Sequence, residues 1–244
     1  MISFKKRNKQ VKKNKTYILS NKSPFAYLEG YKSLRTNLSF LTFSGEVKTI
    51  LVTSSVPNEG KSTVSINVAR TLSMAGHKVL LIDADLRAPV IQKYLNVNYK
   101  ITSGLSSVLA SKAQIKDAIY KSPSLEMDVI FSGPIPPNAV ELLSRDRAKT
   151  SIETLRKRYD YIIIDSPPAG VVTDSVVLSQ HVDGVLYVVR QNHAEKELVK
   201  NAMKDLVSME ANILGIIFND YIDERSKRKG SRDKYSYYYQ SGNK

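Results

Sequence analysis

The sequence predicts an α/β domain in which a mostly parallel β-sheet is covered by helices on both faces. Short apolar runs rich in β-branched residues alternate with segments long enough for helices, as in repeated strand–helix–strand units. The runs are continuous rather than alternating, which is typical of strands buried on both sides. They occupy residues 49–53, 79–82, 127–131, 161–164, 185–189 and 213–218.

Helices are expected before the first strand and between the others. Residues 25–41 follow Ser23-Pro24, a dipeptide that often starts a helix, and residues 61–74 show an apolar pattern with helical period. Residues 139–157 are expected to form one further helix. Together these elements predict a folded domain at residues 23–222.

The two ends of the chain are polar and basic and lack this pattern. The formal charge is +14, and the first fifteen residues hold seven basic residues and no acidic one. We expect residues 1–22 to be a flexible basic arm and residues 223–244 to be a disordered, tyrosine-rich tail. Such ends suit nucleic acid, anionic lipid or an acidic partner, and a merely solubilising role is an equal alternative.

Composition excludes several kinds of site. The chain has no cysteine, which removes disulfides, zinc–thiolate sites and iron–sulfur clusters. No stretch approaches the roughly 20 apolar residues that span a bilayer, and the basic N-terminus lacks the apolar segment of a secretory signal. We therefore expect a soluble, intracellular protein with at most peripheral membrane contact.

A phosphate-binding motif lies between the first strand and the next helix. Residues 55–62 match the P-loop pattern G-x-x-x-x-G-K-[ST] at Gly60, Lys61 and Ser62, while Ser55 replaces the first glycine. Backbone N–H groups of such a loop, together with a helix N-terminus, form an anion site. Lys61 is expected to reach the β- and γ-phosphates, and the Ser62 hydroxyl to ligate Mg²⁺. The nucleotide-binding residues expected here are Ser55, Pro57, Asn58, Glu59, Gly60, Lys61, Ser62 and Thr63.

Two acidic motifs follow at the ends of predicted strands. Asp83 and Asp85 follow the strand at 79–82, and Asp165 ends the strand at 161–164. In right-handed strand–helix–strand units these ends share one sheet edge with the P-loop. An aspartate that ends an apolar strand is the Walker B arrangement, which holds Mg²⁺ directly or through water. The alternative for each is a helix cap or loop residue, and Asp85 fits that alternative best.

These motifs together resemble the bacterial tyrosine kinases of capsule and exopolysaccharide synthesis. The resemblance covers nearly the whole chain and implies a P-loop NTPase fold and an ATP-dependent protein-tyrosine autokinase that uses Mg²⁺. Segments typical of eukaryotic kinases (V-A-I-K, H-R-D and D-F-G) are absent from the sequence. The motifs that carry the resemblance are the P-loop at 55–62, LLIDADLRAP at 80–89, GPIPPNAVELL at 133–143, the strand at 161–165 with Pro167-Pro168, and the C-terminal tyrosines.

The resemblance also implies roles for single residues. Lys61, Asp83 and Asp85 would be catalytic, with Asp83 as the base toward the incoming tyrosine hydroxyl. A tyrosine phenol has a pKa of about 10, so at neutral pH it needs a proton acceptor. Mg²⁺ would be organised by Ser62, Asp85 and Asp165.

Two further residues each have two possible roles. By the resemblance, the amide of Asn219, at the end of the last strand, would read the adenine edge, and a turn residue is the equal alternative. Arg87 would either assist phosphoryl transfer or form a structural ion pair.

The tyrosine-rich tail is the phosphate acceptor that the resemblance implies. Its residues have nothing apolar nearby to pack against, so the tail is expected to enter the active site of a neighbouring subunit. The acceptors would be Tyr235, Tyr237, Tyr238 and Tyr239.

Oligomerisation is implied by the helix at 25–41. Glu29, Lys32 and Arg35 are spaced by three along one side of this helix, where the family carries E-x-x-R-x-x-R for ring assembly. Lys32 keeps the charge of the family's arginine but loses its bidentate fork. A solvated charged face is the alternative.

The implied partners are a transmembrane polysaccharide co-polymerase-type adaptor that activates the kinase and a cognate phosphotyrosine phosphatase; nucleic acid is not expected. In the Gram-positive split form, adaptor and kinase are separate chains, and the kinase is cytoplasmic, held at the inner face of the membrane by the adaptor. The alternative function is a partition or septum-positioning ATPase switch without kinase activity. Such proteins carry an additional lysine early in the P-loop, which residues 54–59 lack.

Overall fold

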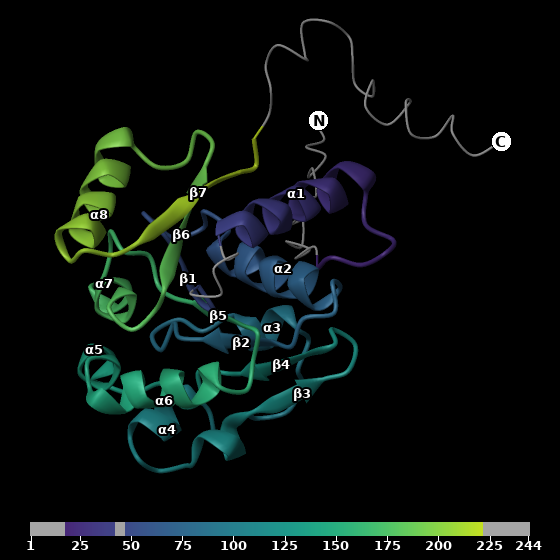
Figure 1. Ribbon diagram of the computed structural model, residues 1–244. Helices are drawn as coiled ribbons and strands as arrows, with labels where there is room; N and C mark the ends of the chain where they lie inside the picture. Colours follow the sequence, from purple (N-terminus) through teal and green to yellow (C-terminus); the bar gives the residue numbers. More distant parts are fainter. Residues whose placement is uncertain (1–17, 42–46, 222–244) are drawn as a thin grey trace, which may run out of the picture.

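The computed structural model describes residues 18–41 and 47–221 (Figure 1). They form one seven-stranded sheet in the order β3-β4-β2-β5-β1-β6-β7, and every neighbouring pair is parallel except β3 and β4. The predicted mostly parallel sheet is therefore confirmed. Its strands are β1 (Thr49–Ser54), β2 (Val79–Asp83), β3 (Tyr120–Ser122), β4 (Met127–Ile130), β5 (Tyr161–Asp165), β6 (Gly184–Arg190) and β7 (Ile213–Asn219).

Helices cover both faces of the sheet, as predicted (Figure 1). Two clusters of buried apolar side chains, one on each face, hold the three layers together. One face carries α1 (Phe25–Leu41), α2 (Lys61–Ser73) and α3 (Ile91–Tyr94). The other carries α4 (Leu105–Leu109), the 3₁₀ helix η1 (Ile115–Ala118), α5 (Ala139–Leu143), α6 (Asp146–Arg156), α7 (Asp174–Ser179) and α8 (Lys196–Ser208).

The strand β3 was not predicted from the sequence. It has three residues, is only partly buried and pairs antiparallel with β4. The turn that joins the two strands ends at Glu126, whose φ is 51°. A strand this short and this polar gives no apolar run, so the sequence carries no periodic signal for it.

The single helix predicted at 139–157 is wrong, because the chain forms α5 and α6 there. Arg145 interrupts the helical path with extended backbone angles, φ −73° and ψ 151°. The segment contains neither glycine nor proline, so no breaker marks the interruption in the sequence.

The predicted arm at residues 1–22 extends too far toward the domain. Leu19 is buried, and its backbone N–H donates to Asn67 Oδ1 of α2 at 2.8 Å. Residues 18–22 therefore connect directly to the folded part. Residues 1–17 and the tail at 223–244, including its tyrosines, lie outside the described residues. Within the described part of the chain, no helix is both long enough and apolar enough to cross a membrane.

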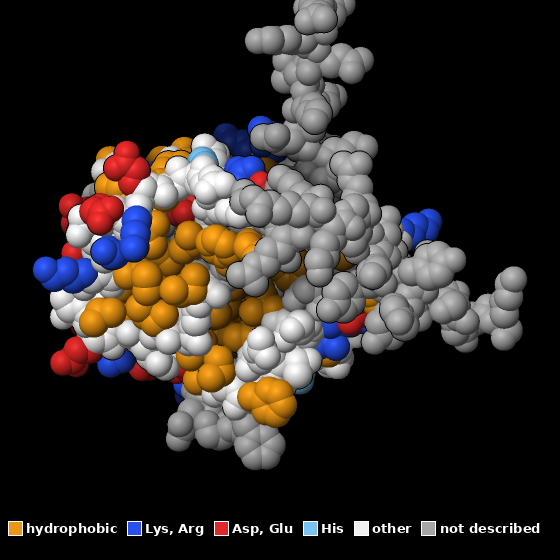
Figure 2. Space-filling model, turned by 90° about the horizontal axis from the view of Figure 1, so that it is seen from above, with side chains coloured by type: hydrophobic (Ala, Val, Ile, Leu, Met, Phe, Trp, Pro, Cys, Tyr) orange, Lys and Arg blue, Asp and Glu red, His pale blue; other side chains and the backbone are white. Residues whose placement is uncertain are grey.

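The last strand differs from the central ones in its burial. Every residue of β1 is buried, whereas Ile216 and Phe218 of β7 are 55% and 51% exposed. Figure 2 shows hydrophobic side chains gathered on the face seen from above, where β7 and α8 lie. A continuous apolar run thus predicted burial on both faces correctly for β1 and incorrectly for β7, because β7 is the edge strand.

Candidate active site

The carboxyl ends of three adjacent strands bring the predicted site together. β1 leads into the loop at 55–62, and α2 begins at Lys61. In the register of the sheet, Asp83 of β2 lies beside Asp165 of β5, and Asp165 lies beside Val52 of β1. The topology therefore places the P-loop and these aspartates at one sheet edge, as the strand-end pattern predicts.

Lys61 is the centre of this group. Its Nζ lies 3.1 Å from Asp85 Oδ2 and 3.7 Å from Asp165 Oδ2, and it donates to Ser62 Oγ at 3.3 Å. The lysine side chain is only 11% exposed. Burial alone would lower the pKa of Lys61, but the carboxylates of Asp165 and Asp85 outweigh this effect and raise it. The ammonium is therefore charged at neutral pH.

The surroundings of the site favour the charged form of Lys61 but disfavour the charged forms of Asp165 and Asp83. Burial raises the pKa of Asp165, although the Lys61 ammonium opposes the rise. Ser65 Oγ donates to Asp165 Oδ1 at 2.9 Å, whereas Asp165 Oδ2 accepts no hydrogen bond from the described residues. Burial and the negative charges of Asp165 and Asp85 raise the pKa of Asp83 well above its usual range.

Asp83 and Asp85 are oriented differently. The two oxygens of Asp83 accept the backbone N–H groups of Asp85 and Ile91, at 3.2 Å each, and the residue is fully buried. Asp85 Oδ1 accepts the N–H of Ala88 at 2.9 Å, while Oδ2 faces Lys61. Asp85 is therefore both a loop residue and part of the charged site, while its roles in catalysis and Mg²⁺ binding stay predictions.

The loop itself is shaped by close packing at two positions. Gly60 has a φ of 93°, and a Cβ there would lie 2.2 Å from Asn219 Nδ2, so a larger residue would strain the backbone and displace the Asn219 amide. Ser55, which replaces the usual first glycine, is buried and accepts the hydroxyl of Tyr187 at 2.9 Å. Burial raises the pKa of Tyr187 to about 12, so this hydroxyl remains a donor at neutral pH.

Glu59 occupies part of the predicted anion site. Its carboxylate is fully buried, and Oε2 accepts the N–H groups of Ser55 at 2.7 Å and Val56 at 2.9 Å. These two amides are thus already satisfied within the loop. The backbone N–H groups of residues 58–63 donate to no described protein group, so they remain for an anion.

Asn219, Arg190 and His193 contact the outer side of the loop. Asn219 Nδ2 donates to the carbonyl of Glu59 at 2.8 Å. Arg190 and His193 contact the carbonyls of Asn58 and Pro57, and neither was predicted from the sequence. The available signal was their place directly after the apolar strand at 185–189, at the same edge as the aspartates.

Other predicted residues have partners within the chain. Arg87 forms two hydrogen bonds of 2.9 Å with the buried carboxylate of Asp174, which is the structural ion pair. Glu29 and Lys32 pair with each other at 2.7 Å on the surface of α1. Arg35 instead donates to the carbonyl of Thr71 at 3.0 Å, so it faces α2 rather than solvent alone.

The oxygen atoms near Lys61 fit a hard divalent cation. Ser62 offers a hydroxyl, Asp85 a carboxylate, and Asp165 a buried carboxylate oxygen without a hydrogen-bond donor. Among the described residues, no three His, Cys, Asp or Glu side chains converge as a metal site. Mg²⁺ commonly takes one or two protein carboxylates and completes its shell with water and phosphate oxygens, so the two carboxylates and the hydroxyl near Lys61 fit it.

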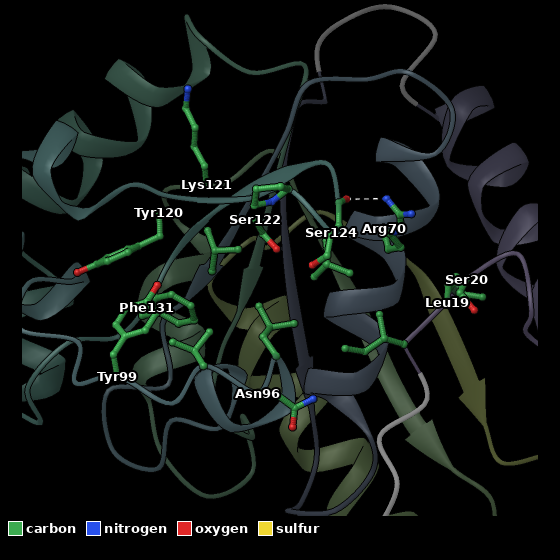
Figure 3. A pocket seen from close by; sticks show the side chains of 16 residues that line it. Leu19, Ser20, Arg70, Asn96, Tyr99, Tyr120, Lys121, Ser122, Ser124 and Phe131 are labelled. Carbon is green, nitrogen blue, oxygen red and sulfur yellow. Dashed lines mark hydrogen bonds between the residues drawn. The ribbon is translucent and has the colours of Figure 1, made fainter.

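A separate hollow of about 420 Å³ lies away from this site (Figure 3). Its wall includes Leu19, Tyr99, Tyr120 and Phe131, and at one side Arg70 donates to the carbonyl of Leu125 at 2.7 Å. It shares no residue with the loop at 55–62. The candidate active site is therefore defined by converging charged groups and not by this hollow.

The strand–loop–helix with its lysine and strand-end aspartates defines a P-loop nucleotide-binding protein. The family model described as an AAA domain matches residues 47–212. The chain belongs to the bacterial tyrosine-protein kinases: it is 37% identical over 210 residues to tyrosine-protein kinase YwqD of Bacillus subtilis, covering 86% of this chain and 85% of YwqD.

Solved structures agree with this family. The kinase domain of the Escherichia coli tyrosine kinase ETK matches with a TM-score of 0.77 and 34% identity, covering 81% of this chain and 76% of that one. The chimerical protein CapA2B2 matches with a TM-score of 0.76 and 34% identity, covering 83% and 87%.

The septum-site protein MinD of Pyrococcus horikoshii, complexed with Mg-ADP, represents the alternative class. It matches less well, with a TM-score of 0.61 and 27% identity over 75% of this chain and 73% of MinD. The comparison therefore favours the kinases over the septum-positioning ATPases.

Proposed function

We propose that this kinase is an ATP-dependent protein-tyrosine autokinase that regulates capsular or exopolysaccharide synthesis and export. The observation that carries the proposal is the position of Lys61 between Asp85 and Asp165, at the end of the P-loop and beside Asp83. The related kinases named above support the reaction type. The resemblance of the acidic segment at 80–89 and of the tail supports the choice of substrate.

The residues of the site meet the main demands of phosphoryl transfer. This reaction has a loose transition state, so catalysis consists mostly of positioning and charge neutralisation. The charged Lys61 ammonium and the N–H groups of residues 58–60 would supply positive potential for the β- and γ-phosphates. Asn219, next to Gly60, would read the adenine edge with the amide atoms that the Glu59 carbonyl does not use.

Asp83 is proposed as the proton acceptor for the incoming phenol. Burial and the neighbouring carboxylates raise the pKa of Asp83, which strengthens its carboxylate as a base. Because Asp83 is fully buried, the phenol can reach it only if the segment after β2 moves. Ser62, Asp85 and Asp165 would hold Mg²⁺, which supplies further neutralisation of the transferring phosphoryl group.

The phosphate acceptors in this proposal are Tyr235, Tyr237, Tyr238 and Tyr239 of a neighbouring subunit. Glu29, Lys32 and Arg35 of α1 would contribute to a ring of subunits. The activating partner would be a transmembrane adaptor, the reverse reaction would fall to a phosphotyrosine phosphatase, and the kinase would act in the cytoplasm at the inner face of the membrane.

The proposal is tested by incubating the full chain with Mg-ATP and the cytoplasmic segment of the adaptor. We expect mass spectrometry to find phosphotyrosine in residues 235–239. If the tail gains no phosphate under these conditions, the autokinase proposal fails.

Transfer between subunits is tested by mixing two variants. One is Lys61→Met with an intact tail, and the other has a functional site but lacks residues 223–244. We expect phosphate on the tail of the Lys61→Met chain. A phosphate-free tail in that chain, when the unaltered protein is phosphorylated in parallel, would exclude transfer in trans.

A further inference from the structure

Three consecutive backbone carbonyls on the outer side of the P-loop are each bound by a different side chain. The carbonyl of Pro57 accepts His193 Nε2 at 2.8 Å, and that of Asn58 accepts an Arg190 terminal nitrogen at 3.2 Å. The next carbonyl, of Glu59, accepts Asn219 Nδ2 at 2.8 Å. The three donors come from the end of β6, the turn after it and the end of β7.

These bonds fix the direction of the amides that matter for phosphate binding. In a planar trans peptide the C=O and N–H bonds point to opposite sides. Carbonyls turned outward at residues 57–59 therefore turn the N–H groups of residues 58–60 inward. Within residues 18–41 and 47–221, no protein group accepts a hydrogen bond from these three N–H groups.

Two residues of the loop have left-handed backbone angles. Asn58 has a φ of 67° and Gly60 a φ of 93°, both in the left-handed region. Asparagine and glycine adopt these angles more readily than other residues, and the outside donors bind the carbonyls of the two peptide groups between them. Glu59 braces the loop from within, and its Oε1 also accepts the backbone N–H of Arg190 at 3.3 Å. The strand β6 thus contacts the loop through both the backbone and the side chain of Arg190.

Arg190 is itself held in place. Its Nε and its other terminal nitrogen donate to a single oxygen of Asp220, at 3.1 and 2.7 Å. The side chains of this ion pair are 40% exposed at Arg190 and 59% exposed at Asp220, so the pair adds little to stability. Its main effect is to orient the Arg190 guanidinium. The guanidinium is left with one nitrogen directed at the Asn58 carbonyl.

We propose that Arg190 and His193, with Asp220 behind Arg190, are positioning residues that aim the N–H groups of residues 58–60 at the phosphates of the bound nucleotide. The proposal rests on nucleotide binding by the loop. It makes a specific claim about selectivity: the carbonyl clamp formed by Arg190 and His193 acts on the phosphates and not on the base.

The test is a set of equilibrium binding measurements on the full chain with Mg-ADP, Mg-ATP and adenosine. For Arg190→Ala we expect Mg-ADP and Mg-ATP to bind about tenfold more weakly, while adenosine binds as to the unaltered protein. For His193→Ala we expect about a threefold loss, and recovery in His193→Gln, whose amide again donates to the Pro57 carbonyl. Asp220→Asn should cost about twofold.

Arg147→Ala is the matched control. Arg147 also donates to a backbone carbonyl, that of Val108 at 2.6 Å, but it lies on α6, away from the loop. We expect its loss to leave nucleotide affinity unchanged, and thermal unfolding of each variant verifies that it is folded.

Two results would overturn the clamp. One is an Arg190→Ala protein that stays folded and binds Mg-ADP normally, and the other is an equal loss for adenosine and Mg-ADP. If the unaltered chain itself does not bind Mg-ADP, the nucleotide site fails and the clamp fails with it.

Discussion

The carboxylates at the carboxyl ends of the strands (the carboxyl edge) and at their amino ends (the amino edge) are bound in opposite ways. At the carboxyl edge, Asp165 is fully buried, has an oxygen that accepts no hydrogen bond from the described residues, and has a raised pKa. At the amino edge, Asp183 accepts the N–H groups of Lys48 and Thr49 at 2.8 Å each, and the Thr49 hydroxyl at 2.7 Å. Arg156 also pairs with Asp183.

The hydrogen bonds decide which way each pKa moves. Burial alone would raise the pKa of Asp183, but the donors from Thr49, Lys48 and Arg156 outweigh it, so its pKa is lowered. The charged carboxylate of Asp183 therefore stabilises the fold, because both of its oxygens accept hydrogen bonds. The charged form of Asp165 lowers the stability of the fold, because burial raises its pKa. Such destabilised groups are common at functional sites.

The largest expected effect on activity comes from removing the Lys61 ammonium at the carboxyl edge. We expect Lys61→Met to lower kcat/KM for phosphorylation of the tail by about a thousandfold, because no other described cation contacts both Asp85 and Asp165. The measurement is phosphotyrosine formed over time with Mg-ATP. Lys200→Met serves as control, since Lys200 is 62% exposed and pairs only with Glu197 on α8. Activity within tenfold of the unaltered protein would show that Lys61 is not central.

Replacing Asp165 separates function from stability. We expect Asp165→Asn to lower kcat/KM about a hundredfold, because it removes a charge that the site needs. We also expect its free energy of unfolding, measured with urea in nucleotide- and metal-free buffer, to stay level or rise by about 1 kcal/mol. The amide still contacts Ser65 and no longer carries a desolvated charge. A loss of about 3 kcal/mol would instead make Asp165 a stabilising residue like Asp183.

The same substitution at the amino edge should do the reverse. We expect Asp183→Asn to lower the free energy of unfolding by about 2 kcal/mol, because an amide nitrogen would face N–H donors that now have an acceptor. Kinase activity measured well below the unfolding temperature should stay within about twofold. Asp205→Asn, an exposed aspartate on α8, is the control for loss of charge alone. If Asp183→Asn lowered activity and spared stability, the contrast between the two edges would be wrong.

The sequence predicted those parts of the site that follow from the order and direction of the strands. Asp83 and Asp165 end apolar strands, and parallel strands bring such ends to one edge, so their proximity follows from pattern alone. The central strands β1, β2 and β5 were predicted for the same reason, because each is a continuous apolar run.

The contacts that the sequence did not predict depend on the direction of individual backbone groups. The inward turn of Glu59 and the contacts of Arg190 and His193 follow from where individual carbonyls point, and no spacing of residue types reports that. The break between α5 and α6 and the short strand β3 are further cases, since no breaker residue marks the first and no apolar run marks the second.

The smallest expected effect is a pH dependence that belongs to the amino edge alone. Because the pKa of Asp183 is lower in the folded chain than the usual value of about 3.9, its stabilising contribution is fully present above about pH 4 and is lost as the pH falls through the folded value. The difference in unfolding free energy between the unaltered protein and Asp183→Asn should therefore be constant from pH 7 to about pH 5 and shrink below about pH 4. Urea unfolding at intervals of pH measures it. A difference that grows on acidification would mean that the hydrogen bonds from Thr49 and Lys48 do not favour the charged carboxylate.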